Sequence, residues 1–282
     1  MQIRWPHGFI GPRCQGTRAW PTRRRQLRCA SCKQLTSATA GTVLHKSRVP
    51  LRGWWLACTR KTGLGAAGLQ RALGLGSCRT AWLLLQKLRS ALARGDRERL
   101  AGTVAVDETS VGGSEEGVRG RQPVSKCPVP VAVELDGERM GRIRLRHVAA
   151  ASGHSSGGFI GDCAEAGSTV HTDGWRGCTG PERAGSVHAV RPPRGDDEIA
   201  TAECPRVPLV VSLLKRWLTG THQGGFGPQH LQLYPDEFTF RFNRRKSRHV
   251  GKIIYRSAEQ LMVRQTITYK GLTARRTPSR AL

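Results

Sequence analysis

The spacing of apolar residues divides the chain into parts with different periods. In residues 50–97 the apolar positions recur at intervals of three or four residues or of whole turns, which is typical of amphipathic helices. These positions are Leu69, Leu73, Trp82, Leu85, Leu88 and Leu92. Gly74 and Gly76 interrupt the pattern, so we predict two helices joined by a tight turn, with Ser77 as the N-cap of the second. The arrangement favours a helix-turn-helix, although an ordinary helical hairpin has the same pattern.

Residues 101–247 have a different pattern, in which apolar residues alternate with polar ones or form continuous runs, as in β-strands. Four segments show it: TVAVDE from Thr103, PVPVAVEL from Pro128, GRIRLRHV from Gly141 and STVHTD from Ser168. Helical patterns follow around residues 207–218 and 230–245. We therefore predict an α/β domain whose first strands are antiparallel.

The N-terminal module, residues 1–45, has little hydrophobic periodicity and is rich in Arg, Pro and Cys, which suits a small metal-stapled unit. Cys29 and Cys32 form a Cys-x-x-Cys pair, and Cys14 adds a third thiol. Nine cysteines in a chain of 282 residues do not suggest a disulfide framework, so Zn²⁺ is the favoured partner. Three thiolates need a fourth ligand to complete a tetrahedron, and His7 and water are the candidates.

Charge is unevenly distributed along the chain. Lys and Arg number 46 against 20 Asp and Glu, a net charge of +26. Residues 1–100 carry +18 and residues 241–282 carry +11, whereas the middle carries −3. Basic flanks around a slightly acidic centre indicate a nucleic-acid partner, because phosphate contacts supply most non-specific affinity. No apolar run approaches the length of a membrane span or of a signal peptide, so we expect a soluble, cytoplasmic, nucleoid-associated protein.

The basic C-terminal tail, residues 248–282, contains one more helical pattern, KIIYRSAEQLMVRQ. The sequence that follows it, TYKGLTARRTPSRAL, is predicted to be disordered because it is basic and poor in apolar residues.

Two aspartates stand at the ends of predicted strands. Asp107 follows an apolar strand and precedes a Gly-Gly turn, and Asp173 follows a strand and precedes Gly174. Such carboxylates are hard oxygen ligands for Mg²⁺ or Mn²⁺, and two of them close together suit metal-dependent phosphoryl transfer. Each aspartate alone is also common in ordinary turns.

Five strings occur in order along the chain: GTVAVDETSVGG, PVPVAVELDGERMGRIRLRHV, GSTVHTDGW, VVSLLKRWLTGTHQGG and HLQLYPDEFTFRFNRR. Together they resemble the ISXO-like family of DDE-type insertion-sequence transposases, from about residue 4 to about residue 260. The resemblance implies a zinc ribbon followed by a ribonuclease-H-like mixed sheet with flanking helices. It also implies Mg²⁺- or Mn²⁺-dependent cleavage and strand transfer at element ends, carried out by a homo-oligomer on DNA.

On this resemblance Asp107 and Asp173 are the first and second catalytic aspartates. The third metal ligand of the family precedes a helical lysine by seven residues, and here Lys215 is that lysine, so Pro208 stands at the ligand position. Proline has no ligand atom and is expected to disturb the helix. Glu237, seven residues before Arg244, is a candidate substitute.

The resemblance also reveals two further departures. The first zinc knuckle of the family begins with Cys, and this chain has Gly11 there. Pro235 lies in the expected interior of the last core helix, where proline costs about 3 kcal/mol. The chain is therefore either an active transposase or a DNA-binding derivative that does not cut. A zinc-ribbon transcription factor or RNA-binding protein is a third alternative, and it would lack paired carboxylates.

Candidate DNA contacts lie in two places. The predicted second helix of the helix-turn-helix carries Arg79, Trp82, Lys87 and Arg89, which suit a groove-reading helix. Lys215, Arg216, Arg244 and Arg245 are expected near the metals, facing the DNA backbone. A solvated basic face is the alternative for this second set.

Overall fold

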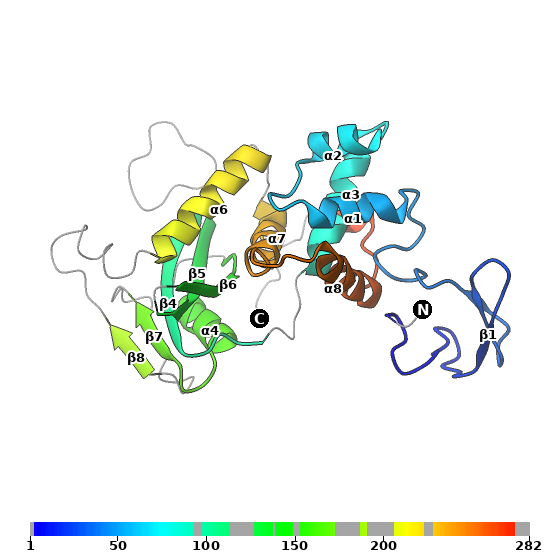
Figure 1. Ribbon diagram of the computed structural model, residues 1–282, viewed down its shortest axis with the longest axis horizontal. Coiled ribbons are helices and arrows are strands. Elements are labelled where there is room, and N and C mark those ends of the chain that lie inside the picture. The colour runs from blue at the N-terminus through cyan, green and yellow to red at the C-terminus, as the bar shows by residue number, and fades with distance from the viewer. Residues whose placement is uncertain are drawn as a thin grey trace, which may run out of the picture. The chain divides into compact units, whose positions relative to one another are not determined.

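The computed structural model describes residues 3–92, 98–112, 127–137, 139–148, 153–172, 187–190, 206–222 and 228–273. The chain forms two compact units (Figure 1). Unit 1 consists of Met1–Arg94 together with Ser247–Leu282, and unit 2 consists of Gly95–Lys246. Among the described residues, no helix is long and apolar enough to cross a bilayer.

Unit 1 begins with a small antiparallel sheet. Its strands β1 (Ala19–Pro21), β2 (Leu27–Cys29) and β3 (Leu35–Thr36) are hydrogen-bonded in the order β1-β2-β3. The strands are too short to bury much apolar surface, so this sheet needs stabilisation beyond its own core, as the sequence predicts.

Helices form the rest of unit 1: α1 (Leu51–Thr59), α2 (Ala66–Leu73), α3 (Cys78–Leu92), α8 (Val250–Val263) and α9 (Tyr269–Thr273). The predicted pair of helices is confirmed. Helix α2 ends at Gly74, whose φ of 62° is left-handed and favours glycine. The Ser77 hydroxyl accepts a hydrogen bond from the Arg79 N–H at 3.2 Å, as an N-cap does.

The predicted C-terminal helix is confirmed as α8, which packs against α1 and α3. The segment after it also contacts the N-terminal part of the chain, because the Val43 N–H donates to the Arg264 carbonyl at 3.0 Å. The prediction of disorder beyond α8 is wrong for Tyr269–Thr273, which form α9. Leu272 in α9 is buried, and this apolar anchor explains why the short helix is ordered.

Unit 2 is built on a five-stranded mixed sheet with the order β6-β5-β4-β7-β8. Its strands are β4 (Thr103–Val111), β5 (Cys127–Asp136), β6 (Arg139–Leu145), β7 (Thr169–Thr172) and β8 (Val187–Val190). Strands β4, β5 and β6 pair antiparallel, whereas β4, β7 and β8 pair parallel. The four predicted strands and the antiparallel start are confirmed, and β8 was not predicted.

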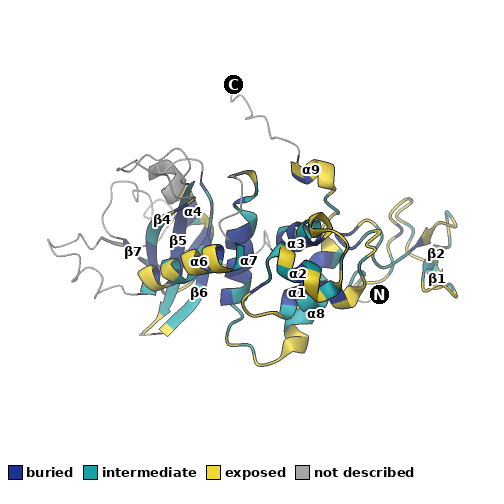
Figure 2. Ribbon diagram, turned by 90° about the horizontal axis from the view of Figure 1, so that it is seen from above, coloured by how far each residue is buried: buried dark blue, intermediate teal, exposed yellow. Residues whose placement is uncertain are grey.

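Helices cover both faces of this sheet. On one face lie α6 (Arg206–His222) and α7 (Leu233–Phe242), which follows a 3-10 turn at Pro228–His230, and on the other lies α4 (Gly153–Cys163). Figure 2 shows that α7 is mostly buried and that the strands are buried or half-buried, whereas α6 exposes its outer side. Helix α4 was not predicted, because its sequence GHSSGGFIGDC is rich in Gly and Ser.

The two prolines expected to disturb helices lie where they are tolerated. Pro208 is the third residue of α6 and Pro235 the third residue of α7. The first N–H groups of a helix have no intrahelical acceptor, so proline loses nothing there. The expected penalty at Pro235 is therefore wrong, because the helix begins later than its pattern suggests.

Prolines also determine where β6 ends. In β5 the carbonyls of Pro128 and Pro130 accept hydrogen bonds from Val148 and Arg146, at 3.1 and 3.3 Å. Neither proline has an N–H to donate in return, so pairing with the third strand weakens at this point. Accordingly β6 ends at Leu145, earlier than its predicted end.

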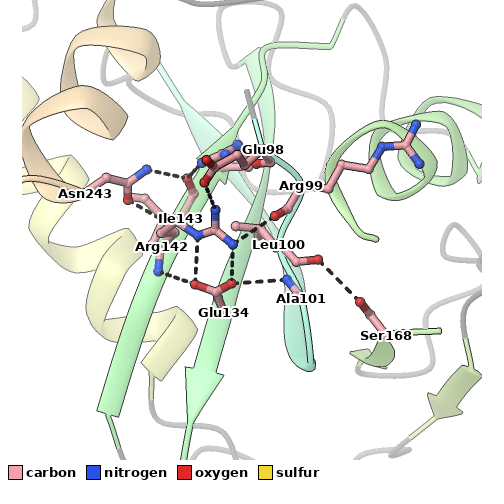
Figure 3. A network of polar contacts seen from close by, with 10 residues as sticks. Glu98, Arg99, Leu100, Ala101, Glu134, Arg142, Ile143, Ser168 and Asn243 are labelled. Atoms are coloured by element: carbon pink, nitrogen blue, oxygen red, sulfur yellow. Dashed lines mark hydrogen bonds and ion pairs between the residues drawn. The ribbon is translucent and has the colours of Figure 1, made fainter. Parts of the chain in front are cut away.

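A half-buried carboxylate holds the other end of these strands together (Figure 3). Glu134 lies at an irregularity between β5 and β6 and accepts hydrogen bonds from the N–H groups of Ala101 (3.1 Å) and Arg142 (3.0 Å). The Arg142 guanidinium adds two more, at 3.0 and 2.7 Å. A Cβ at position 141 would lie 2.7 Å from Glu134 Oε2, so a larger residue than glycine would displace this carboxylate.

This network makes stability depend on pH. Partial burial alone would raise the pKa of Glu134, but the hydrogen bonds from Arg142 and Ala101 outweigh it and lower the pKa from 4.5 to about 2. A lowered pKa contributes stability that is complete above about pH 4.5 and is lost as the pH falls towards 2.

We therefore expect Glu134→Gln to destabilise the protein by about 1–3 kcal/mol at pH 7, and by progressively less between pH 5 and pH 2. Urea unfolding at a series of pH values measures the difference. The control is Asp162→Asn, which alters an exposed ion pair to Arg146 and should cost less than about 1 kcal/mol. An unchanged pH dependence in Glu134→Gln would contradict this account.

Candidate active site and metal centre

Asp107 lies on the central strand β4, on the face covered by α6 and α7. The register of β4 with β5 is unbroken from Thr103 to Val111, so alternate residues point to opposite faces. Ala105 and Val111 pack in the apolar cluster beneath α6 and α7. Asp107 is separated from both by an even number of residues, so it points to the same face. Its Oδ1 accepts a hydrogen bond from the Glu108 N–H at 2.6 Å, which restricts rotation of the carboxylate.

The neighbouring parallel strand β7 leads towards the second predicted aspartate. Thr103, Val104 and Ala105 each pair with the residue 66 positions later, and Ala105 pairs with His171. His171 is therefore on the same face as Asp107, whereas Val170 packs with the cluster under α4. Asp173 lies outside the described residues, which end at Thr172 in this part of the chain.

Helix α6 packs against β4 and β5 and carries the expected third-ligand position. Val207, Val210 and Leu214 are buried against the sheet, whereas Pro208 is exposed in the first turn. Lys215 and Arg216 are also exposed. The expected spacing holds, because Pro208 and Lys215, two turns apart, are both on the solvent side of the helix. At this position, however, the chain offers no ligand atom.

Glu237 does not have the surroundings of a metal ligand. It is completely buried on α7, and its Oε1 accepts hydrogen bonds from Arg241 Nε at 2.8 Å and Nη2 at 2.6 Å. Helix α7 packs against β6, two strands away from β4 in the sheet. Arg244, expected two turns along the same helix, lies beyond the end of α7 at Phe242. The structure therefore gives Glu237 a structural ion pair in place of the predicted substitution.

Arg244 and Arg245, which follow α7, make contacts within unit 2. Arg244 stacks on Phe240 and Arg245 on Phe242, each at 3.9 Å from the ring centroid. Arg245 also donates to the carbonyls of Gly141 and Met140 in β6, and burial lowers its pKa. This contact fastens the end of α7 to the sheet, a role that the sequence did not indicate.

The three predicted zinc ligands come together in unit 1. Their sulfur atoms lie within 4.8 Å of one another, and Cys14 Sγ is 3.4 Å from Cys29 Sγ. The backbone N–H of Cys32 is the main cause that lowers the pKa of the Cys29 thiol to about 7, which favours the thiolate that zinc binds. Among the described residues this group contains only the cysteines, so His7 is not brought to them.

The candidate DNA contacts on α3 differ in how exposed they are. Arg79 is exposed and stacks on Tyr269 of α9, 5.5 Å from the ring centroid, and Trp82 meets the same ring edge-on. Lys87 is half-buried, and burial lowers its pKa. Arg89 is only 1% exposed, so its predicted role in reading DNA is wrong. Because Arg89 is polar, the helical pattern predicts that it lies on the surface. In the structure α8 packs against α3 and helps to cover that helix.

The small sheet presents a basic and apolar row that the sequence did not reveal. Trp20 is paired with Arg28, and Arg28 with Leu35, so the three side chains are neighbours across the strands. All three are exposed, Trp20 by 47% and Leu35 by 51%, and Lys33 lies over the Trp20 ring. Only the strand register places them together.

The order β6-β5-β4-β7-β8, with antiparallel pairing on one side of β4 and parallel pairing on the other, defines unit 2 as a ribonuclease-H-like domain. Residues 99–243 match the profile of the ISXO2-like transposase domain, and residues 1–34 match that of the transposase zinc-ribbon domain. The chain belongs to the ISXO2-like, DDE-type insertion-sequence transposases. Comparison with curated proteins gave no match.

The Glu237–Arg241 pair can be tested by stability. We expect Glu237→Ala to destabilise unit 2 by roughly 3 kcal/mol, because it removes the buried carboxylate that accepts two hydrogen bonds from the Arg241 guanidinium. Glu259→Ala, which breaks an exposed helical ion pair with Arg256, should cost about 0.5 kcal/mol or less. Both are measured by urea unfolding. If Glu237→Ala were as mild as Glu259→Ala, the carboxylate would have another role.

Proposed function

We propose that this transposase binds the ends of its insertion sequence, that Asp107 and Asp173 hold its catalytic metal, and that it cleaves DNA poorly because Pro208 replaces the third ligand. The observation that carries the proposal is the parallel pairing of β4 with β7. Paired residues of the two strands are 66 positions apart in the sequence. If the pairing continued two residues beyond Ala105 and His171, Asp173 would lie beside Asp107. Neighbouring strands are about 4.8 Å apart, a spacing at which two carboxylates can share a metal.

Asp107 would contribute a hard oxygen ligand whose direction is restricted by the Glu108 N–H. With Asp173, it would hold divalent metal that supplies charge stabilisation for the attacking and leaving oxygens. Lys215 and Arg216 are exposed on α6, the helix that covers the face of the sheet carrying Asp107, and would contact the DNA backbone. Pro208 supplies nothing to the metal, so the ion would be held by fewer protein ligands than in the family pattern.

DNA binding would depend mainly on unit 1. Its first 94 residues contain 18 Lys and Arg and no Glu or Asp, so the unit suits a polyanion. The capped pair α2–α3 exposes Arg79 at the start of its second helix, the part that reads bases in helix-turn-helix proteins. The row of Trp20, Arg28 and Leu35 offers a second surface.

If α3 reads DNA, Arg79→Ala should weaken binding to element-end DNA about tenfold, because a base or phosphate contact is lost. Arg256→Ala removes one equal charge from the same unit, where it is paired with Glu259, and should weaken binding less than about twofold. Fluorescence anisotropy at fixed salt measures both. Equal losses in the two variants would favour the ordinary helical hairpin.

The cleavage proposal predicts that Pro208→Glu raises Mn²⁺-dependent nicking of element-end DNA by about tenfold or more, since it adds a carboxylate in the first turn of α6. Leu209→Glu is the matched control: it adds the same charge one residue further, at a position that is also exposed, and should give no gain. Asp107→Ala should abolish nicking while DNA binding persists.

Two outcomes would contradict this proposal. Efficient nicking by the unmodified chain that depends on Asp107 would show that another residue provides the third ligand. Nicking that survives Asp107→Ala would remove the metal assignment itself. No nicking in any variant, with DNA binding retained, would favour the non-catalytic DNA-binding derivative.

A further inference from the structure

The two turns that carry the zinc ligands are built alike. In the second turn, Cys29–Gln34, the Lys33 N–H donates to the Cys29 carbonyl at 3.1 Å, and the Cys29 N–H donates to the Gln34 carbonyl at 3.0 Å. In the first turn, Gly11–Gly16, Gln15 donates to Gly11 and Gly11 to Gly16, both at 2.9 Å. The residue after the second cysteine position is left-handed in both turns, with φ of 57° at Gln15 and 60° at Lys33. By these bonds Gly11 is the equivalent of Cys29.

A side chain on residue 11 would also point towards the sulfur cluster. A Cβ on residue 11 would lie 3.5 Å from Cys14 Sγ and 3.5 Å from Cys29 Sγ, which is ordinary contact distance. Sulfur atoms around tetrahedral zinc are about 3.8 Å apart, given Zn–S bonds of about 2.3 Å. The first turn has therefore kept the geometry of a zinc turn although the thiol is missing.

Access and charge indicate what could take this corner. Cys14 is exposed and Cys32 is half-buried, whereas Cys29 and Gly11 are buried, so solvent reaches the sulfur cluster from the side of Cys14. Zinc with three thiolates carries one net negative charge, but residues 1–50 contain ten Lys and Arg and no Asp or Glu. Such surroundings stabilise a more anionic complex, and zinc already bound by sulfur accepts a fourth soft ligand readily.

We propose that the ribbon binds Zn²⁺ through Cys14, Cys29 and Cys32, and that an exchangeable small thiolate from solution occupies the fourth position, at Gly11. The incoming thiol gives its proton to solvent, and a bound water leaves as the zinc–sulfur bond forms. The inference rests on the zinc-ribbon assignment and is independent of the catalytic proposal. Its test therefore needs no DNA.

The experiment uses Co²⁺ in place of zinc in the full chain under anaerobic conditions, with 2-mercaptoethanol as the probe. We expect the thiolate-to-cobalt charge-transfer band to rise by about one third and to saturate, as three sulfur ligands become four. Gly11→Cys should show the four-thiolate intensity from the start and should not respond. It should also bind Zn²⁺ on the order of tenfold more tightly in chelator competition.

Two control variants separate the alternatives. Thr17→Cys adds an exposed thiol to the same module and should respond to mercaptoethanol as the unmodified chain does. His7→Ala should leave the cobalt spectrum unchanged. The proposal is overturned if the cobalt-loaded chain ignores mercaptoethanol, if His7→Ala changes its spectrum, or if only Gly11→Cys binds the metal.

Discussion

The arrangement of unit 2 depends on the pairing of β4 along both of its edges. The antiparallel partner β5 fixes which residues of β4 point towards α6, and the parallel partner β7 fixes which residue lies beside each of them. A slip of one residue in either register would turn Asp107 to the face of α4. The Glu134 network holds the beginning of β4 against β5 and β6, so it protects this register from a distance.

Much of this architecture could be predicted from the sequence because the strands of unit 2 are buried on both faces. Continuous apolar runs around Ala105 and Val131 are hard to explain otherwise. Strand β8 is only four residues long and helix α4 is rich in glycine, so neither has a periodic signal. The pattern of apolar residues also does not define where a helix begins. For this reason the sequence predicts more disruption by Pro208 and Pro235 than the structure shows, since both lie in the first turn of their helices.

The candidate site could be predicted only in part, because its residues are joined by long-range geometry. Asp107 remains a prediction from its place after an apolar run, and the register of Thr103 to Ala105 with β7 supports the proposal that pairs it with Asp173. Glu237 matched a sequence spacing, but Arg241 is nearer along the helix and takes its carboxylate. Gly11 was recognised as a missing ligand, and only the two equivalent turns show that its position is preserved.

The discontinuity of unit 1 has a consequence for synthesis of the protein. Helix α8 packs on α1 and α3, yet 152 residues of unit 2 are translated between Arg94 and Ser247. Unit 2 can fold as it leaves the ribosome, whereas the helical part of unit 1 waits for the end of the chain. A polypeptide that ends before α8 would thus contain all of unit 2 beside a helical part of unit 1 that lacks one of its packing partners.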